Sequence, residues 1–171
     1  MEALTAISTR RSIRKYTGQP LTEDTLLEIV RAGMAAPSAF DERPWHFVLI
    51  QEKGTLSKLA SAMEHCEMLR EAGAGLLICG DEALEKAQGM QIWVQDCSAC
   101  AENILLAAHA LGLGAVWLAI YPIAERSSAV RKALQIPQEI SPFALISLGY
   151  PAEQLGAEDR YDANRVHREQ W

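Results

Sequence analysis

Hydrophobic residues recur along the chain with two different spacings, and together they predict a mixture of helices and strands. Three stretches have the spacing of amphipathic or fully covered helices: 23–36, 54–66 and about 91–114. Four short apolar runs predict strands: 45–51 is expected to be a buried strand, and 75–80, 115–120 and 143–150 have the length of strands covered on both faces. A short helix near the N-terminus is expected to run into a loop at residues 16–20.

The helix at 23–36 has clear signals at both ends. Thr22 is placed to cap its first turn, and Glu23 and Asp24 suit the positive end of the helix dipole. Pro37 cannot continue a helix and ends the pattern.

The stretch at 91–114 is apolar on nearly every side, so it predicts a central helix. Such a helix needs cover from a sheet and further helices, or from a partner subunit. The C-terminal segment 160–171 is polar, carries three arginines and ends in Trp171. A terminal segment of this kind either frays or docks on another surface.

Composition limits the classes of partner. The 171 residues include 22 Asp and Glu against 16 Lys and Arg, which disfavours broad binding to nucleic acid or to anionic membranes. No apolar run is long enough to span a membrane, and the N-terminus lacks the charge order of a secretory signal. We therefore expect a cytoplasmic protein.

Cys97 and Cys100 form a CxxC pair, which raises a redox or metal-binding interpretation. Their setting is a helical apolar run with no second CxxC and no suitably spaced histidine pair. Buried packing cysteines are the favoured interpretation, and no metal site is predicted. His46 and His109 have apolar neighbours and are expected to be satisfied core residues.

The basic cluster near the N-terminus predicts a site for a small anion. Arg10 and Arg14 share a side in either a helical or an extended segment, and Ser12 joins them only if the segment is extended. Two guanidinium groups with a hydroxyl between them match a phosphate. The alternative is a solvated basic end to the first helix.

Standard nucleotide motifs do not account for this cluster. Gly112 and Gly114 follow a helix and precede a strand, which reverses the order of a dinucleotide-binding loop. There is no Walker lysine loop and no GxSxG nucleophile elbow. No catalytic nucleophile or base can be assigned, which suits an enzyme whose reactive group belongs to a cofactor.

Five segments in order resemble the FMN-dependent nitroreductase family. They are RRSIRKY (10–16), APSAFDERPWHFVLI (36–50), AENILLAAHALGLGAVWL (101–118), FALISLGYP (143–151) and RYDANRVHREQW (160–171). The resemblance covers essentially the whole chain and implies one FMN-binding domain, residues 1–171. The implied fold is α+β, with a mostly antiparallel central sheet flanked by helices and a long apolar central helix. It also implies a homodimer with FMN at the subunit interface, in which the C-terminal tail, about 152–171, wraps the partner.

The resemblance also implies the function and the cofactor-binding residues. Hydride would pass from NADH or NADPH, through N5 of FMN, to a nitroaromatic, quinone or similar electron-poor acceptor by a ping-pong mechanism. The alternatives are an FMN-binding protein of the same fold without reductase activity, and a specialised member acting on halogenated rings or on flavin itself. The residues that match the family's cofactor contacts are Arg10, Arg11, Ser12, Arg14, Pro37, Ser38, Ala39, Leu118, Ala119, Ile120 and Arg160.

The chain departs from the family pattern at four positions. Asp41 and Arg43 stand where Asn and Gln are common, and an acid there would disfavour an anionic reduced flavin unless Arg43 pairs with it. Ala119 and Ile120 stand where glycines are common, and the bulk of Ile120 is expected either to narrow the approach to N5 or to alter the backbone there.

Overall fold

A four-stranded antiparallel sheet forms the centre of the computed structural model, which describes residues 1–86 and 89–171. The strands, in the spatial order β1-β2-β4-β3, are β1 (Trp45–Ile50), β2 (Ala74–Asp81), β4 (Ile140–Gly149) and β3 (Gly114–Ala119). Every pairing is antiparallel. The predicted α+β class and the mostly antiparallel sheet are confirmed.

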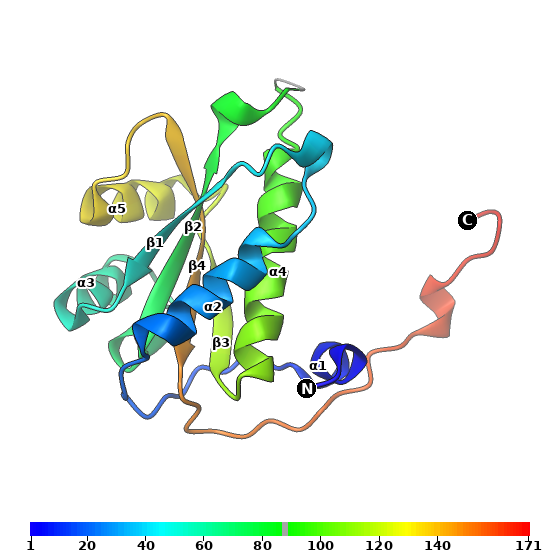
Figure 1. Cartoon of the computed structure of the whole chain (residues 1–171), viewed down its shortest axis with the longest axis horizontal. Coiled ribbons are helices and arrows are strands. Elements are labelled where there is room, and N and C mark those ends of the chain that lie inside the picture. Colours follow the sequence, from blue (N-terminus) through cyan, green and yellow to red (C-terminus); the bar gives the residue numbers. More distant parts are fainter. Residues whose placement is uncertain (87–88) are drawn as a thin grey trace.

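Helices cover both faces of this sheet (Figure 1). The α-helices are α1 (Ala3–Thr9), α2 (Glu23–Met34), α3 (Lys53–Ala62), α4 (Trp93–Ala110) and α5 (Ala124–Leu134). The short 3₁₀ turns are η1 (Ala39–Asp41), η2 (Glu67–Arg70), η3 (Glu82–Leu84) and η4 (Ala163–Arg165). Buried residues of α2 and α4 pack on one sheet face, and those of α3 and α5 pack on the other.

Helix α4 is the predicted central helix, and its cover comes from α2 and the sheet. The two helices approach closely at Gly33, where an added Cβ would lie 2.8 Å from the Ile104 side chain. Cys97 and Cys100 are buried in this contact as free thiols, which confirms the packing interpretation. Burial raises the pKa of both thiols, that of Cys100 to about 12, so they are protonated at neutral pH.

Helix α2 begins after Thr22 as predicted, and Thr22 Oγ1 accepts a hydrogen bond from the Thr25 amide (3.2 Å). It ends at Met34, shortly before the expected stop at Pro37. Helix α3 ends at Ala62, four residues before the expected end, because Met63 takes an extended backbone. No helix among the described residues has the length and apolar character needed to cross a membrane.

Two expectations about strand β1 were wrong. It was expected to be a buried strand, but it lies at the edge of the sheet with only its end residues buried. His46, expected in the core, is exposed on this strand, with Nε2 3.7 Å from an Asp81 carboxylate oxygen. His109 is half-buried and satisfied, since its Nε2 lies 2.8 Å from Thr9 Oγ1.

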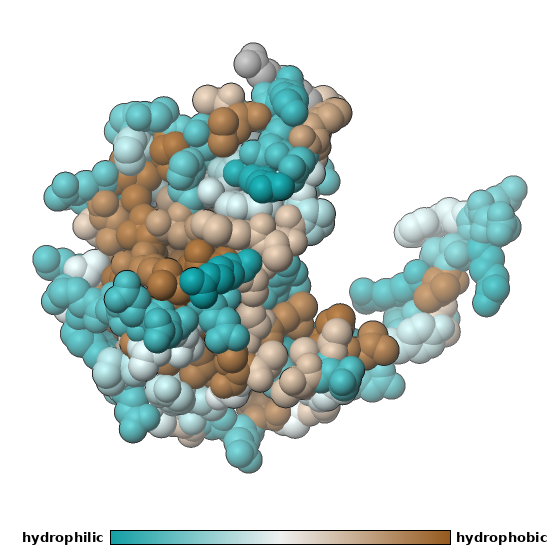
Figure 2. All heavy atoms as spheres, viewed as in Figure 1, coloured by the Kyte–Doolittle hydropathy of each residue, from teal (hydrophilic) through white to brown (hydrophobic). Residues whose placement is uncertain are grey.

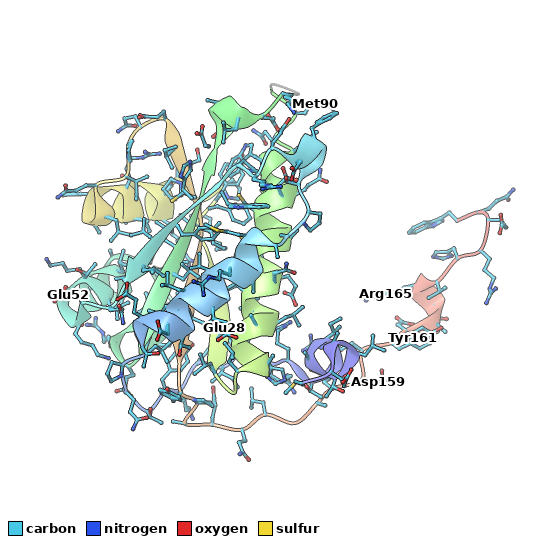
Figure 3. All side chains as sticks on the ribbon, in the orientation of Figure 1. Glu28, Glu52, Met90, Asp159, Tyr161 and Arg165 are labelled. Atoms are coloured by element: carbon cyan, nitrogen blue, oxygen red, sulfur yellow. The ribbon has the colours of Figure 1, made fainter. Side chains whose placement is uncertain are left out.

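The C-terminal tail runs back beside the N-terminal loop and then leaves the body of the protein (Figure 1). The Ala152 amide donates to the Lys15 carbonyl (2.8 Å) where this run begins. Figure 3 shows Asp159 where the tail passes α1, with Tyr161 and Arg165 beyond it. Tyr161 is 75% exposed. The wrapping of this tail around a partner stays a prediction.

Candidate functional site

The predicted anion cluster lies where α1 ends and the chain becomes extended. Helix α1 stops at Thr9, and its last turn contains no basic residue. The segment after it runs along the start of β3, where the Ile13 amide donates to the Ala115 carbonyl (3.0 Å). The cluster is therefore extended, the case in which Ser12 joins the arginines. The alternative of a basic helix end does not describe this geometry.

Three of the predicted arginines line one pocket. Its volume is about 440 Å³, and Arg10, Arg11 and Arg160 contribute to its wall beside Glu158. Arg10 Nε lies 3.2 Å from Glu102 of α4. The structure thus brings the N-terminal motif and the tail arginine together, although they are far apart in the sequence.

A single carboxylate bridges two of these arginines. Glu158 Oε2 lies 3.4 Å from Arg11 Nη2 and 3.2 Å from Arg160 Nη2. Arg11 also donates to the Gly156 carbonyl. A carboxylate oxygen therefore occupies the position between two guanidinium groups that a phosphate oxygen would suit.

Two further predicted contacts, Ser12 and Arg14, follow the pocket residues on the same extended segment but are not part of the pocket wall. The Arg14 guanidinium and the Ser12 hydroxyl make no hydrogen bond to any residue that the structure describes. The Arg14 amide, by contrast, donates to Glu153 (2.7 Å) and fixes the backbone. Fixed backbone with free donors fits a phosphate-bearing ligand, and FMN is such a ligand.

The predicted cofactor contacts Leu118, Ala119 and Ile120 lie at the far end of β3. Ala119 is four residues beyond Ala115, which is about 13 Å along the strand. The Ile120 amide donates to the Phe143 carbonyl of β4 (3.2 Å). Because backbone direction alternates along a strand, the N–H and C=O of Ala119 face away from β4, toward the open sheet edge. Ala119 is exposed there.

The side chain of Ile120, a neighbour of Ala119, does not lie where it was expected. Leu118 and Ile120 turn their side chains into the core beneath α3 and α5, and Ile120 is 0% exposed. Ile120 was expected to narrow the approach to the flavin. Its side chain is instead packed in this core. Ala119 is therefore the residue whose backbone N–H and C=O lie at the sheet edge here.

Pro37, Ser38 and Ala39 lie apart from the arginine pocket. They follow α2, and the Ala39 amide donates to Asp96 Oδ1 (3.0 Å) in the first turn of α4. Helix α1 lies near the opposite end of α4 (Figure 1). One chain therefore does not bring the two groups of predicted contacts together.

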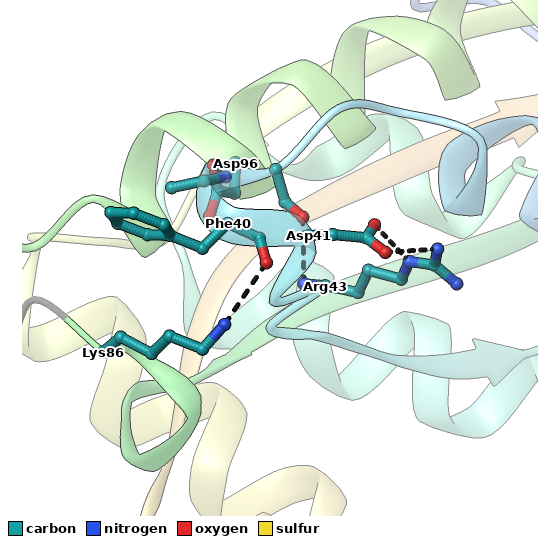
Figure 4. Close-up of polar contacts among 7 residues, drawn as sticks. Phe40, Asp41, Arg43, Lys86 and Asp96 are labelled. Carbon is teal, nitrogen blue, oxygen red and sulfur yellow. Dashed lines mark hydrogen bonds and ion pairs between the residues drawn. The ribbon is translucent and has the colours of Figure 1, made fainter.

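Asp41 and Arg43 form a bidentate ion pair, with both N···O distances at 2.7 Å (Figure 4). The hydrogen bonds from Arg43 lower the pKa of Asp41 below its usual range. An acid at position 41 is compatible with an anionic reduced flavin if Arg43 pairs with it, and this pairing is present. Phe40, Asp41 and Arg43 all have positive φ angles of 50–57°, a conformation that costs energy for residues with side chains.

Two functional candidates were missed from the sequence. Glu158 bridges the pocket arginines, and Arg126 binds the carbonyl of Ala119 (2.9 Å). Glu158 and Arg11 are distant in the sequence, and a turn separates Arg126 from Ala119. No local sequence spacing indicates either contact. Among the described residues, no group of three or more His, Cys, Asp and Glu side chains could hold a metal ion.

The fold and the site together describe an α+β protein with an arginine-lined pocket suited to a small anion. Residues 7–68 and 60–150 match the sequence profile described as the nitroreductase family. The chain belongs to the nitroreductase family. The family, the fold and the expected enzyme class, FMN-dependent NAD(P)H oxidoreductases, are confirmed at this level.

Named relatives cover nearly the whole chain. A protein of Methanothermobacter thermautotrophicus, with the provisional name NADH dehydrogenase/NAD(P)H nitroreductase, is 46% identical over 171 residues, 100% of this chain and 88% of that protein. An FMN-dependent nitroreductase structure from Clostridium difficile superimposes with a TM-score of 0.90 at 28% identity, covering 98% of this chain and 99% of the other. A provisionally named nitroreductase of Desulfovibrio desulfuricans, solved in complex with FMN, gives 0.84 at 30% identity, with coverage of 100% and 98%.

Proposed function

We propose that this protein binds FMN and catalyses electron transfer from NADH or NADPH to a nitroaromatic, a quinone or a similar electron-poor ring. The observation that carries the proposal is the arginine-lined pocket, formed by the segment that runs along the start of β3 and by the tail. At the far end of β3, the backbone of Ala119 faces away from β4. FMN, when bound, supplies a ring that accepts and releases hydride at N5.

The residues of the chain would bind and orient this cofactor. Arg10, Arg11 and Arg160 surround the pocket for the phosphate, and Ser12 and Arg14 provide the adjacent free donors. The Ala119 amide would donate a hydrogen bond to the ring edge. A cation near the pyrimidine end would stabilise negative charge on the reduced ring. No protein acid or base is assigned, since binding and orientation account for the roles of these residues.

The cofactor site is proposed to be shared between two subunits of a homodimer. Pro37, Ser38 and Ala39 are separated from the arginine pocket within one chain, so a partner would supply them. Apolar side chains are exposed around α1, as Figure 2 shows, and they include Leu4 at 80% and Ile7 at 59%. A partner subunit that covers this surface would bury it and would give the tail a surface to dock on.

Mixed dimers test the shared site. Arg14→Ala removes a contact from one half of the site, and Ser38→Trp blocks the other half. Each variant alone is expected to lose most of its activity. A purified dimer with one subunit of each kind contains one intact site and is expected to recover about half of the wild-type activity, if every site draws on both chains. Recovery is not expected if each subunit holds a complete site.

Steady-state kinetics test the reaction. Parallel lines in double-reciprocal plots of rate against NADH or NADPH, at several acceptor concentrations, are expected of a ping-pong mechanism. Intersecting lines would show that both substrates must be bound together and would contradict it. A flavin that dithionite reduces but neither nicotinamide reduces would favour the alternative of an FMN-binding protein without reductase activity.

A further inference from the structure

Arg126 links the open end of β3 to a turn on a different element. It lies in the first turn of α5 and is half-buried. Its Nη1 donates to the Ala119 carbonyl (2.9 Å), and its Nη2 donates to the Glu64 carbonyl after α3 (2.8 Å). Both ends of the guanidinium fork are therefore occupied by backbone oxygens from separate segments.

The direction of the Ala119 backbone determines where this cation lies. In a β-strand the N–H and C=O of one residue point to the same side. Since Arg126 binds the outward carbonyl of Ala119, its positive charge lies at the same open edge as the Ala119 N–H. Beyond Ala119 the chain turns away, because the Ile120 and Tyr121 amides both donate to the Phe143 carbonyl. Arg126 is thus what fixes the outward groups at this strand end.

Besides these two hydrogen bonds, Arg126 also lines a pocket. The pocket beside Arg126 has a volume of about 360 Å³ and also contacts Met63, Ile123 and Glu125. Because a guanidinium group carries its charge at any working pH, it places a permanent cation beside an exposed backbone edge. Cations placed where negative charge develops stabilise that charge.

We propose that Arg126 is a positioning residue: it holds the outward amide of Ala119 against the edge of the flavin ring and makes the bound flavin easier to reduce. The inference rests on the proposed function, because it requires FMN at this strand edge. Removal of Arg126 would let the strand end relax and would remove a cation from beside the ring. The flavin would remain bound through its phosphate, because Arg126 is not part of the wall of the arginine pocket.

The test compares Arg126→Gln and Arg126→Lys with the control Lys132→Gln. Lys132 is an exposed residue of the same helix, and its substitution makes the same change of charge. The midpoint potential of the bound FMN, the anaerobic rate of its reduction by NADH or NADPH, and the FMN dissociation constant are measured for each protein. Loss of the charge-assisted contact is expected to lower the potential and to slow reduction roughly tenfold in Arg126→Gln.

Arg126→Lys keeps the charge but cannot bind both carbonyls with a guanidinium group, so a midpoint potential and a reduction rate between those of wild type and Arg126→Gln are expected. Lys132→Gln is expected to match the wild type. An unchanged potential and reduction rate in Arg126→Gln would overturn the inference. If Arg126→Gln fails to fold, Arg126→Lys decides: wild-type potential and rate in that variant would also overturn it. A wild-type protein that binds no FMN would instead overturn the proposed function, and this inference with it.

Discussion

Glu158 provides a quantitative test of the anion pocket, because its carboxylate occupies the position proposed for phosphate. Its Oε2 lies 3.4 Å from Arg11 and 3.2 Å from Arg160. A phosphate must displace this carboxylate or share the arginines with it. Glu158→Gln keeps the size of the side chain and removes its charge, so FMN is expected to bind more tightly.

The magnitude follows from the exposure of the pairs. The Glu158 side chain is 54% exposed and that of Arg160 is 60% exposed, so water screens both contacts. Ion pairs of this kind contribute about 0 to 1 kcal/mol each. Release of the two arginines, together with loss of repulsion between carboxylate and phosphate, is expected to contribute about 1 kcal/mol. The FMN dissociation constant would then fall about fivefold.

The assay is titration of apoprotein with FMN, followed by the quenching of flavin fluorescence, at low and at high salt. The gain is expected to shrink at high salt, since screening weakens exposed ion pairs. Glu139→Gln is the control, because Glu139 is exposed and makes no ion pair with the described residues. Equal or weaker FMN binding by Glu158→Gln would refute the reasoning. It would show that Glu158 holds the arginines in place and does not compete with phosphate.

Three further predictions concern the N-terminal motif, the tail and the core. Arg14→Ala should remove a contact of about 1.5 to 3 kcal/mol and weaken FMN binding tenfold or more in the same titration, and unchanged affinity would remove Arg14 from the site. Deletion from Arg160 onward should reduce both flavin content and the dimer fraction in light scattering, whereas a dimeric, yellow product would show that the tail is dispensable. Burial raises the pKa values of Cys79 and Cys100 from 9.0 to about 12. Their stabilising contribution is therefore complete below pH 9 and lost as pH rises toward 12, so the free energy of unfolding should fall across this range in denaturant titrations, and a flat profile would contradict the burial.

Much of the fold could be predicted from the sequence because helix and strand spacing are local signals. The start of α2 and the burial of the α4 cysteines follow from residues close together in the chain. The edge position of β1 could not be predicted, since an apolar run has the same pattern in an edge strand and in a central one. His46 was misplaced for the same reason.

The candidate site divides in the same way. The arginine motif could be recognised from its spacing, and the pocket with Arg160 agrees with it. The bridging carboxylate of Glu158 and the fork of Arg126 could not be predicted, because each depends on segments that meet only in the folded chain. The inward packing of Ile120 depends on which face of β3 meets α3 and α5, and one sequence position does not reveal it.

We propose that the chain holds FMN and that a nicotinamide nucleotide reduces it. An anaerobic visible spectrum of the purified protein, recorded before and after addition of NADH and then of NADPH, tests both parts together. We expect flavin absorption bands that bleach with at least one nucleotide and return when an electron-poor acceptor is added. A colourless protein that takes up no added FMN would contradict it, because the arginine pocket would then hold some other anion.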